Sequence, residues 1–163
     1  MTGKRILLTA FCGTSAELLV KGIELDSQYQ VLYLPNDKMK DSELLIDALQ
    51  QEQFAYVISL GQRPNIKDKV HVETTARKGQ CVIATDFDCE GLKEVLEQKG
   101  LEAKLSDNAG TSFCNELYWN GLQYLNDKKT GTKMVFLHVP FEKNILDITW
   151  FKEILLTGLE QTL

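Results

Sequence analysis

RILLTAFCGTSAELLVKGIE (residues 5–24) passes from an apolar run through a Cys-Gly turn into a segment of helical periodicity. The run at 5–11 predicts a buried strand, and the segment at 15–24 predicts a helix with Thr14 or Ser15 at its N-cap. A strand followed directly by a helix is the repeating unit of α/β sheets. The turn between the two lies at the strand's carboxyl end, where ligands usually bind in such sheets.

The same alternation continues along the chain. Short apolar or β-branched runs alternate with longer segments of 3.6-residue periodicity, and no repeat or interdomain linker interrupts them. Further strands are predicted at 29–34, 55–61, 69–75, 80–84, 102–106 and 132–140, and helices at 41–53, 89–99, 114–126 and 148–159. We therefore expect residues 1–163 to form a single α/β hydrolase-like domain, with three α/β/α layers around a mainly parallel, mixed central sheet of the phosphorylase/hydrolase-like type.

Composition and charge narrow the classes of function. The chain has 163 residues, 44% hydrophobic and 25% charged, which suits one core. Its net charge is −5 and no segment concentrates Lys and Arg, so neither nucleic acid nor an anionic membrane is an expected partner. The apolar runs are much shorter than the ~20 residues of a transmembrane helix, and no export signal is visible. These features favour a cytoplasmic protein.

Cysteine and histidine usage points the same way. The four cysteines are irregularly spaced in a chain long enough to bury a core, so no disulfide framework is expected and a reducing compartment fits. There is no C-x-x-C pair and there are only two histidines, so neither a metal site nor a cofactor is expected. Asp86 and Asp88 offer a possible metal pair, but Asp88 is more simply explained as the N-cap of the next helix.

Cys114 and His138 are the residues most suggestive of chemistry. Cys114 is predicted at the first turn of a helix, where unpaired N–H groups and the helix dipole stabilise a thiolate and can hold an oxyanion. His138 is predicted near the carboxyl end of the last strand, at the same rim of the sheet. A neutral imidazole there can accept the proton of the thiol, which would lower the thiol pKa. The spacing therefore predicts a nucleophile and its general base.

A third group is needed to orient the imidazole, and Glu73 is an acid within the otherwise apolar or hydroxylic run VHVETTA. Each of these residues also has a structural interpretation. Cys114 suits a small buried apolar position, His138 a strand end bonded to backbone, and Glu73 a solvated edge strand. His71 alternates with apolar neighbours and is expected to face solvent.

Several local strings resemble the pyroglutamyl peptidase I family of cysteine peptidases. SDNAGTSFCN (106–115) is similar to the family's cysteine motif, and FLHVP (136–140) to its histidine motif. VHVETTA resembles the segment with the family's glutamate, LGQR (60–63) the Gly-Gln turn before it, and KRILLTAF (4–11) the first strand and turn.

The resemblance implies a cysteine-type omega peptidase that removes an N-terminal pyroglutamyl residue from peptides through an acyl-enzyme, without a metal. By this resemblance, Cys114, His138 and Glu73 match the family's catalytic triad, and Phe11 and Gln62 match residues of its lactam pocket. Phe113 is a further candidate for the pocket, because an uncharged lactam needs aromatic walls and amide partners. The resemblance also implies a small peptide or cyclic-amide substrate and a homo-oligomer.

The chain departs from the family pattern in its loops. FCGTSAE follows the first strand in place of an Asp-Pro-Phe-Gly-Gly-like loop, so one pocket aromatic is missing. Beyond Ala76-Arg77, nothing matches the segment that follows the family's glutamate. Two alternatives therefore stay open: the same triad with a different small acyl or cyclic amide substrate, and a non-catalytic binding module.

Overall fold

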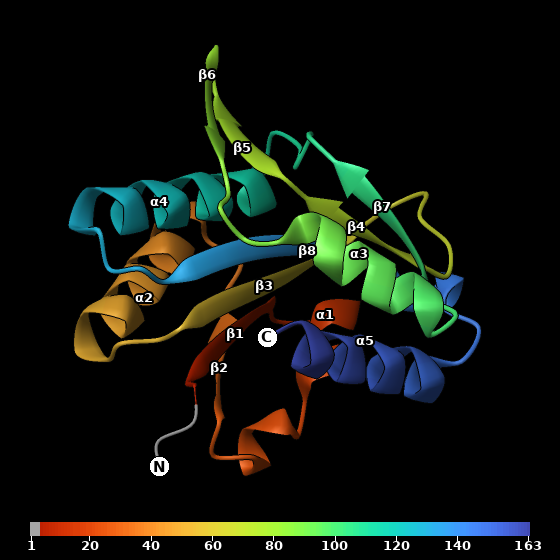
Figure 1. Ribbon diagram of the computed structural model, residues 1–163. Coiled ribbons are helices and arrows are strands. Elements are labelled where there is room, and N and C mark those ends of the chain that lie inside the picture. Colours follow the sequence, from red (N-terminus) through yellow and green to blue (C-terminus); the bar gives the residue numbers. More distant parts are fainter. Residues whose placement is uncertain (1–3) are drawn as a thin grey trace.

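The computed structural model describes residues 4–163 and has three layers, with helices on both faces of a central sheet (Figure 1). The sheet has six strands in the order β2-β1-β3-β8-β4-β7. Its strands are β1 (Ile6–Phe11), β2 (Tyr29–Leu34), β3 (Tyr56–Arg63), β4 (Lys69–Glu73), β7 (Glu102–Ser106) and β8 (Lys133–Pro140). All pairings are parallel except that of β4 with β8. The predicted mixed, mainly parallel α/β/α sheet is therefore confirmed.

Two separate apolar cores lie on the two faces of the sheet because successive strand residues point to opposite sides. In β8, Val135, Leu137 and Val139 belong to one core, whereas Met134 and Phe136 belong to the other. The first core is covered by α1 (Ser15–Val20), α3 (Cys89–Gln98) and α5 (Ile148–Thr162), and the second by α2 (Lys38–Gln51) and α4 (Phe113–Lys128). His138 shares the face of β8 that α2 and α4 cover.

All five α-helices of the described residues differ from their predicted limits by one to four residues, and the differences in the first two have local reasons. The first ends at Val20, because Gly22 takes a left-handed φ of 93°, and a short 3₁₀ turn (Ile23–Leu25) follows. The second begins at Lys38 rather than at 41, because the Asp37 carboxylate caps the N–H groups of Met39 and Lys40. Its polar first turn carries no apolar periodicity, so the pattern alone placed the start too late.

The region around the predicted strands 69–75 and 80–84 is also different. The first strand stops at Glu73, and β5 (Thr75–Lys78) pairs with β6 (Cys81–Ala84) in a separate two-stranded sheet. This hairpin projects away from the body beside α4 (Figure 1). Among the described residues, no helix is long and apolar enough to cross a membrane.

Candidate active site

The predicted nucleophile and base lie over neighbouring strands on the face covered by α2 and α4. Gly61 of β3 is in register with His138 of β8, so these two positions are adjacent across the sheet. A Cβ added to Gly61 would lie 2.6 Å from Cys114 Sγ, which places the thiol directly above Gly61. The absence of a side chain at Gly61 leaves the space that the thiol occupies next to the histidine strand.

Glu73 and His138 form a buried pair. His138 Nδ1 lies 2.8 Å from Glu73 Oε1, and the two residues are 2% and 0% exposed. An ionised carboxylate only accepts hydrogen bonds, so Nδ1 carries the proton and Nε2 keeps its lone pair. The pair depends on the antiparallel strand, since Glu73 of β4 is in register with Phe136, two residues before His138. This geometry suits an imidazole oriented to act as a base.

The carboxylate has a second partner that the sequence did not indicate. Arg63 Nη1 donates to Glu73 Oε1 at 3.2 Å, and Arg63 Nη2 donates to the carbonyl of Asn108 at 2.6 Å. The hydroxyl of Tyr118 in α4 fixes the backbone carbonyl of Glu73 at 2.8 Å. Glu73 is thus held by both a guanidinium and the helix that carries the cysteine. The LGQR string contained Arg63, but only the sheet register shows that it meets Glu73.

Cys114 lies in the first turn of α4, as predicted. Ser112 is the N-cap residue, but its side chain makes no hydrogen bond to the helix. The first backbone N–H groups of α4 are therefore not capped by Ser112. Asn115 fixes this helix start against the hairpin: its amide accepts from Arg77 N at 2.9 Å and donates to Arg77 O at 2.8 Å. The first turn therefore presents backbone donors beside the thiol, a suitable place for an oxyanion.

Burial controls the ionisation of the thiol and the imidazole. It raises the pKa of the Cys114 thiol to about 12, against the opposing effect of the Arg63 guanidinium. It also lowers the pKa of His138 below the ordinary 6.5, with Glu73 opposing the shift. Burial therefore opposes both the thiolate and the imidazolium, and the lowered thiol pKa, which requires an imidazole within hydrogen-bond reach of the thiol, stays a prediction. No hydrogen bond joins Cys114 to His138 within residues 4–163, and such bonds commonly tighten only when substrate binds.

The three predicted pocket residues converge on the cysteine. Phe11, Gln62 and Phe113 line a cavity of about 170 Å³ together with Thr14, Asn36 and Cys114. A cavity of this size suits a small ring rather than a peptide chain. Phe11 is buried, whereas Phe113 is 38% exposed at the rim. The cavity thus joins two aromatic walls to the thiol.

Gln62 has one side of its amide already engaged. Its Oε1 accepts from the backbone N–H of Ser15 at 3.1 Å and lies 3.4 Å from the Ser15 hydroxyl, which also donates to the carbonyl of Pro140. The amide orientation follows from these donors, so Nε2 remains to donate to a carbonyl in the cavity. Asn36, which the sequence did not single out, reaches the same cavity with φ of 66° and donates to Cys12 O at 2.9 Å.

Other candidate residues occupy different places. Asp88 caps α3 by accepting from Gly91 N at 2.9 Å, as predicted. Within the described part of the chain, no cluster of three His, Cys, Asp or Glu side chains is arranged to hold a metal ion. His71 does not simply face solvent: it is half-buried, its Nδ1 is enclosed without a hydrogen-bond partner within residues 4–163, and its side chain lines a second cavity.

A thiol, an imidazole and a carboxylate on one face of a three-layer sheet define the class of α/β cysteine hydrolases. The pyroglutamyl peptidase profile matches residues 65–149. The chain belongs to the pyroglutamyl peptidase family.

Curated relatives agree with this assignment. The chain is 41% identical over 91 residues to a pyrrolidone-carboxylate peptidase of Brevibacillus brevis, an alignment that covers 55% of this chain and 42% of the relative. It is 26% identical over 174 residues to pyrrolidone-carboxylate peptidase 2 of Caldanaerobacter subterraneus, covering 84% of this chain and 81% of the relative. The similarity is therefore strongest over about half of the chain and weaker elsewhere.

Solved structures share the fold over nearly the whole length. A pyrrolidone carboxyl peptidase from Fervidobacterium islandicum superposes with a TM-score of 0.87 at 20% identity, covering 98% of each chain. Pyroglutamyl peptidase I from Bacillus amyloliquefaciens superposes with a TM-score of 0.84 at 18% identity, covering 99% of this chain and 95% of that one. At these identities the comparison establishes the fold.

Proposed function

We propose that this protein is a cysteine peptidase that removes an N-terminal pyroglutamyl residue from peptides, with Cys114 as nucleophile, His138 as general base and Glu73 as the group that orients it. The convergence of a buried Glu73–His138 pair with Cys114 above Gly61, beside a small aromatic cavity, supports this function most directly. Family membership independently favours the same reaction.

The cavity has the chemistry of a lactam pocket. A pyroglutamyl ring is flat, uncharged and largely apolar, so it suits the space between Phe11 and Phe113. Its ring carbonyl needs a donor, and Gln62 Nε2 is the amide group left unused by Ser15. Charged N-terminal residues are disfavoured, because among residues 4–163 no ionisable side chain other than the Cys114 thiol lines the cavity.

The first half of the reaction forms an acyl-enzyme. As Cys114 Sγ attacks the carbonyl carbon, His138 Nε2 takes the thiol proton, so the nucleophile ionises only during the attack. The carbonyl oxygen becomes an oxyanion, which the backbone N–H groups at the start of α4 stabilise. His138 then gives the proton to the leaving amine as the C–N bond breaks, and a thioester remains on Cys114.

The second half hydrolyses the thioester. His138 accepts a proton from water as the water oxygen attacks the thioester carbonyl, and it returns the proton to Cys114 as the C–S bond breaks. Free pyroglutamate leaves the cavity. Glu73 keeps Nδ1 protonated throughout and stabilises the imidazolium formed in each half-reaction.

The test is hydrolysis of a fluorogenic pyroglutamyl amide by the purified protein. We expect turnover by the wild type and by Cys81→Ala, which removes an exposed thiol on the hairpin. Cys114→Ala should lose at least ~10³-fold in kcat/KM, because the covalent route is gone. No wild-type turnover, or equal turnover by Cys114→Ala, would contradict the proposal.

We further propose that residues 1–163 act as one domain, in the cytoplasm, as a homo-oligomer with small peptide or cyclic-amide substrates. The free thiols at all four cysteines suit a reducing compartment. The two-stranded β5–β6 sheet projects from the body, and within the described residues β6 has no strand on its outer edge, a feature that can favour pairing with a second chain. Light scattering on the purified protein measures the oligomeric state, and a monomeric mass at micromolar concentration would rule out a stable oligomer.

A further inference from the structure

A row of four in-register positions crosses the sheet from the thiol to its far edge. Gly61 pairs with His138, His138 pairs with His71, and His71 pairs with Lys104. Directly paired residues point to the same face, so the side chains of His138, His71 and Lys104 all lie on the face that carries Cys114. With strands ~4.8 Å apart, Lys104 lies about 14 Å from Gly61 along this row.

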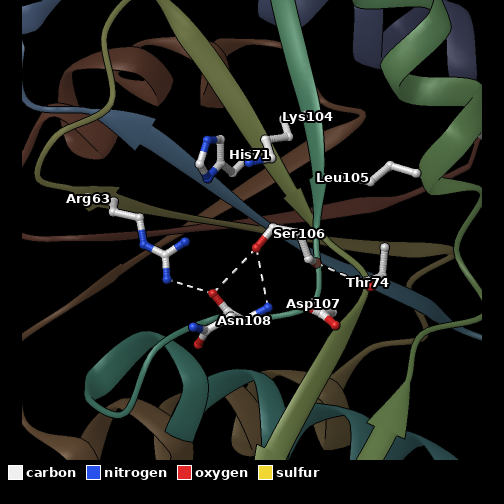
Figure 2. Close-up of a pocket in the computed structure, with 8 residues that line it drawn as sticks. All are labelled: Arg63, His71, Thr74, Lys104, Leu105, Ser106, Asp107 and Asn108. Carbon is white, nitrogen blue, oxygen red and sulfur yellow. Dashed lines mark hydrogen bonds between the residues drawn. The ribbon is translucent and has the colours of Figure 1, made fainter.

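A second cavity lies at the end of this row. It has a volume of about 560 Å³ and is lined by Arg63, His71 and Lys104, among others. Figure 2 shows His71 and Lys104 close together on one side, with Arg63 and Asn108 facing them from the other. Arg63 also donates a hydrogen bond to Glu73, so one residue of the cavity wall directly contacts the Glu73–His138 pair.

Among the described residues that line the cavity, Lys104 carries the one charge without an ion-pair partner. The one acid of this lining, Asp107, is paired with Arg77 at 3.5 Å, outside the cavity lining. Lys104 makes no ion pair within residues 4–163, and His71, whose pKa burial lowers, lines the cavity as a neutral imidazole. An unpaired ammonium beside an imidazole N–H is suited to binding a carboxylate.

We infer that this cavity, built on His71 and Lys104, binds a carboxylate on the leaving-group side of the substrate; this rests on the function proposed above. The acyl pocket lies on the β1 side of Cys114, so the leaving peptide extends the other way, across β8 toward β4 and β7. The leaving nitrogen must meet His138 to receive its proton. A carboxylate one residue further on then reaches His71 and Lys104.

Two kinds of substrate supply that carboxylate: a pyroglutamyl dipeptide with a free C-terminus, and a longer peptide with an acidic second residue. Four substrates separate them: pyroglutamyl-alanine, its C-terminal amide, and the amides of pyroglutamyl-glutamate and pyroglutamyl-glutamine. For each carboxylate substrate that uses the cavity, we expect kcat/KM to be about 3- to 10-fold higher than for its neutral partner. This is the range expected of a partly exposed ion pair with an added hydrogen bond.

The variants Lys104→Gln and His71→Gln test the assignment. Lys104→Gln should reduce the preference at least threefold, and His71→Gln should reduce it in the same direction. Lys133→Gln removes the same charge from the opposite end of β8 and should leave the preference unchanged. An equal preference in the wild type and in Lys104→Gln would overturn the inference while leaving the proposed peptidase function intact.

A binding measurement covers the case of an inactive protein. Calorimetry with Cys114→Ala should show tighter binding of pyroglutamyl-alanine than of its amide, and Lys104→Gln added to that variant should remove the difference. Binding of neither ligand, together with no turnover of any pyroglutamyl substrate, would overturn both this inference and the proposed function.

Discussion

Glu73 and His138 are 65 positions apart in the chain, yet Oε1 and Nδ1 lie 2.8 Å apart in a fully enclosed part of the sheet. The contact exists because β4 runs antiparallel to β8 and places Glu73 opposite Phe136. Glu73 stabilises the imidazolium that the reaction forms, whereas burial favours the neutral base needed at the start.

Glu73→Gln should lower kcat/KM by about 10²- to 10⁴-fold, because an amide neither fixes the Nδ1–H tautomer nor stabilises the imidazolium. Glu73 raises the pKa of His138, so its removal lowers that pKa further. Activity needs neutral His138 and falls as pH drops through its pKa; the acid limb of the variant therefore moves to lower pH. A pH–rate profile measures this shift, with Glu102→Gln on the surface as control. An acid limb at unchanged or higher pH would contradict the role of Glu73.

Arg63→Met should shift the same acid limb the opposite way. Arg63 lowers the pKa values of both His138 and Cys114, so both rise when the guanidinium is lost. We also expect slower alkylation of Cys114 by iodoacetamide at neutral pH, since less thiolate is present. Arg5→Met, which breaks the ion pair with Glu52, is the matched control. Unchanged alkylation and pH–rate profiles in Arg63→Met would show that the guanidinium does not influence the site.

Gly61→Ala should destroy activity with a smaller effect on folding. The new Cβ would lie 2.6 Å from Cys114 Sγ and 2.8 Å from the Phe136 ring, so the thiol must move. Overpacking of this kind costs ~1–3 kcal/mol in free energy of unfolding. Gly121→Ala meets the flexible Met134 side chain at 2.5 Å, inside the α4–β8 contact, and serves as control. We expect kcat/KM to fall at least ~10²-fold only in Gly61→Ala. Full activity in a folded Gly61→Ala protein would show that the thiol does not need this space.

Asp41→Asn should stabilise the protein at neutral pH. Asp41 is 1% exposed, and neither carboxylate oxygen completes a well-formed hydrogen bond within residues 4–163. Burial raises its pKa above the ordinary 3.8, although the nearby backbone N–H groups of Asp37 and Asn36 partly oppose the shift. A raised folded-state pKa means that the ionised form destabilises the fold at every pH above the ordinary value, and that this cost disappears as pH falls below 3.8. We expect a gain of about 1 kcal/mol at pH 7, measured by urea unfolding.

The exposed Asp47 on the same helix gives the control Asp47→Asn, which should change stability little. Asp41 also raises the pKa of Cys114, so Asp41→Asn should speed thiol alkylation. A loss of stability at pH 7 in Asp41→Asn would show that the carboxylate is stabilised by its surroundings.

The sequence predicted the sheet and the three site residues because both depend on patterns that are local. The continuous apolar runs of β1, β3 and β8 predicted these strands, and the rule that ligands bind at carboxyl strand ends placed Cys114 and His138 at one rim. The strings around Cys114, His138 and Glu73 added the family resemblance. In the structure these residues converge on one face of the sheet.

What the sequence missed depends on strand direction and register. Periodicity does not indicate that β4 is antiparallel, so it gave no sign that Arg63 meets Glu73 or that His71 and Lys104 extend the row beyond His138. For the same reason, the sequence did not show that β5 and β6 form a two-stranded sheet separate from the main one. The raised pKa of Cys114 escaped prediction because burial is a tertiary property.

The central claim is that Cys114 carries the pyroglutamyl group as a thioester, and acid-quench mass spectrometry tests it most directly. The wild type is mixed with a pyroglutamyl ester, quenched within the first turnover and digested for peptide mapping. The account predicts a pyroglutamyl adduct on the peptide containing Cys114, and none on peptides containing Cys12, Cys81 or Cys89. Turnover without an adduct on Cys114, or an adduct on another cysteine, would contradict it.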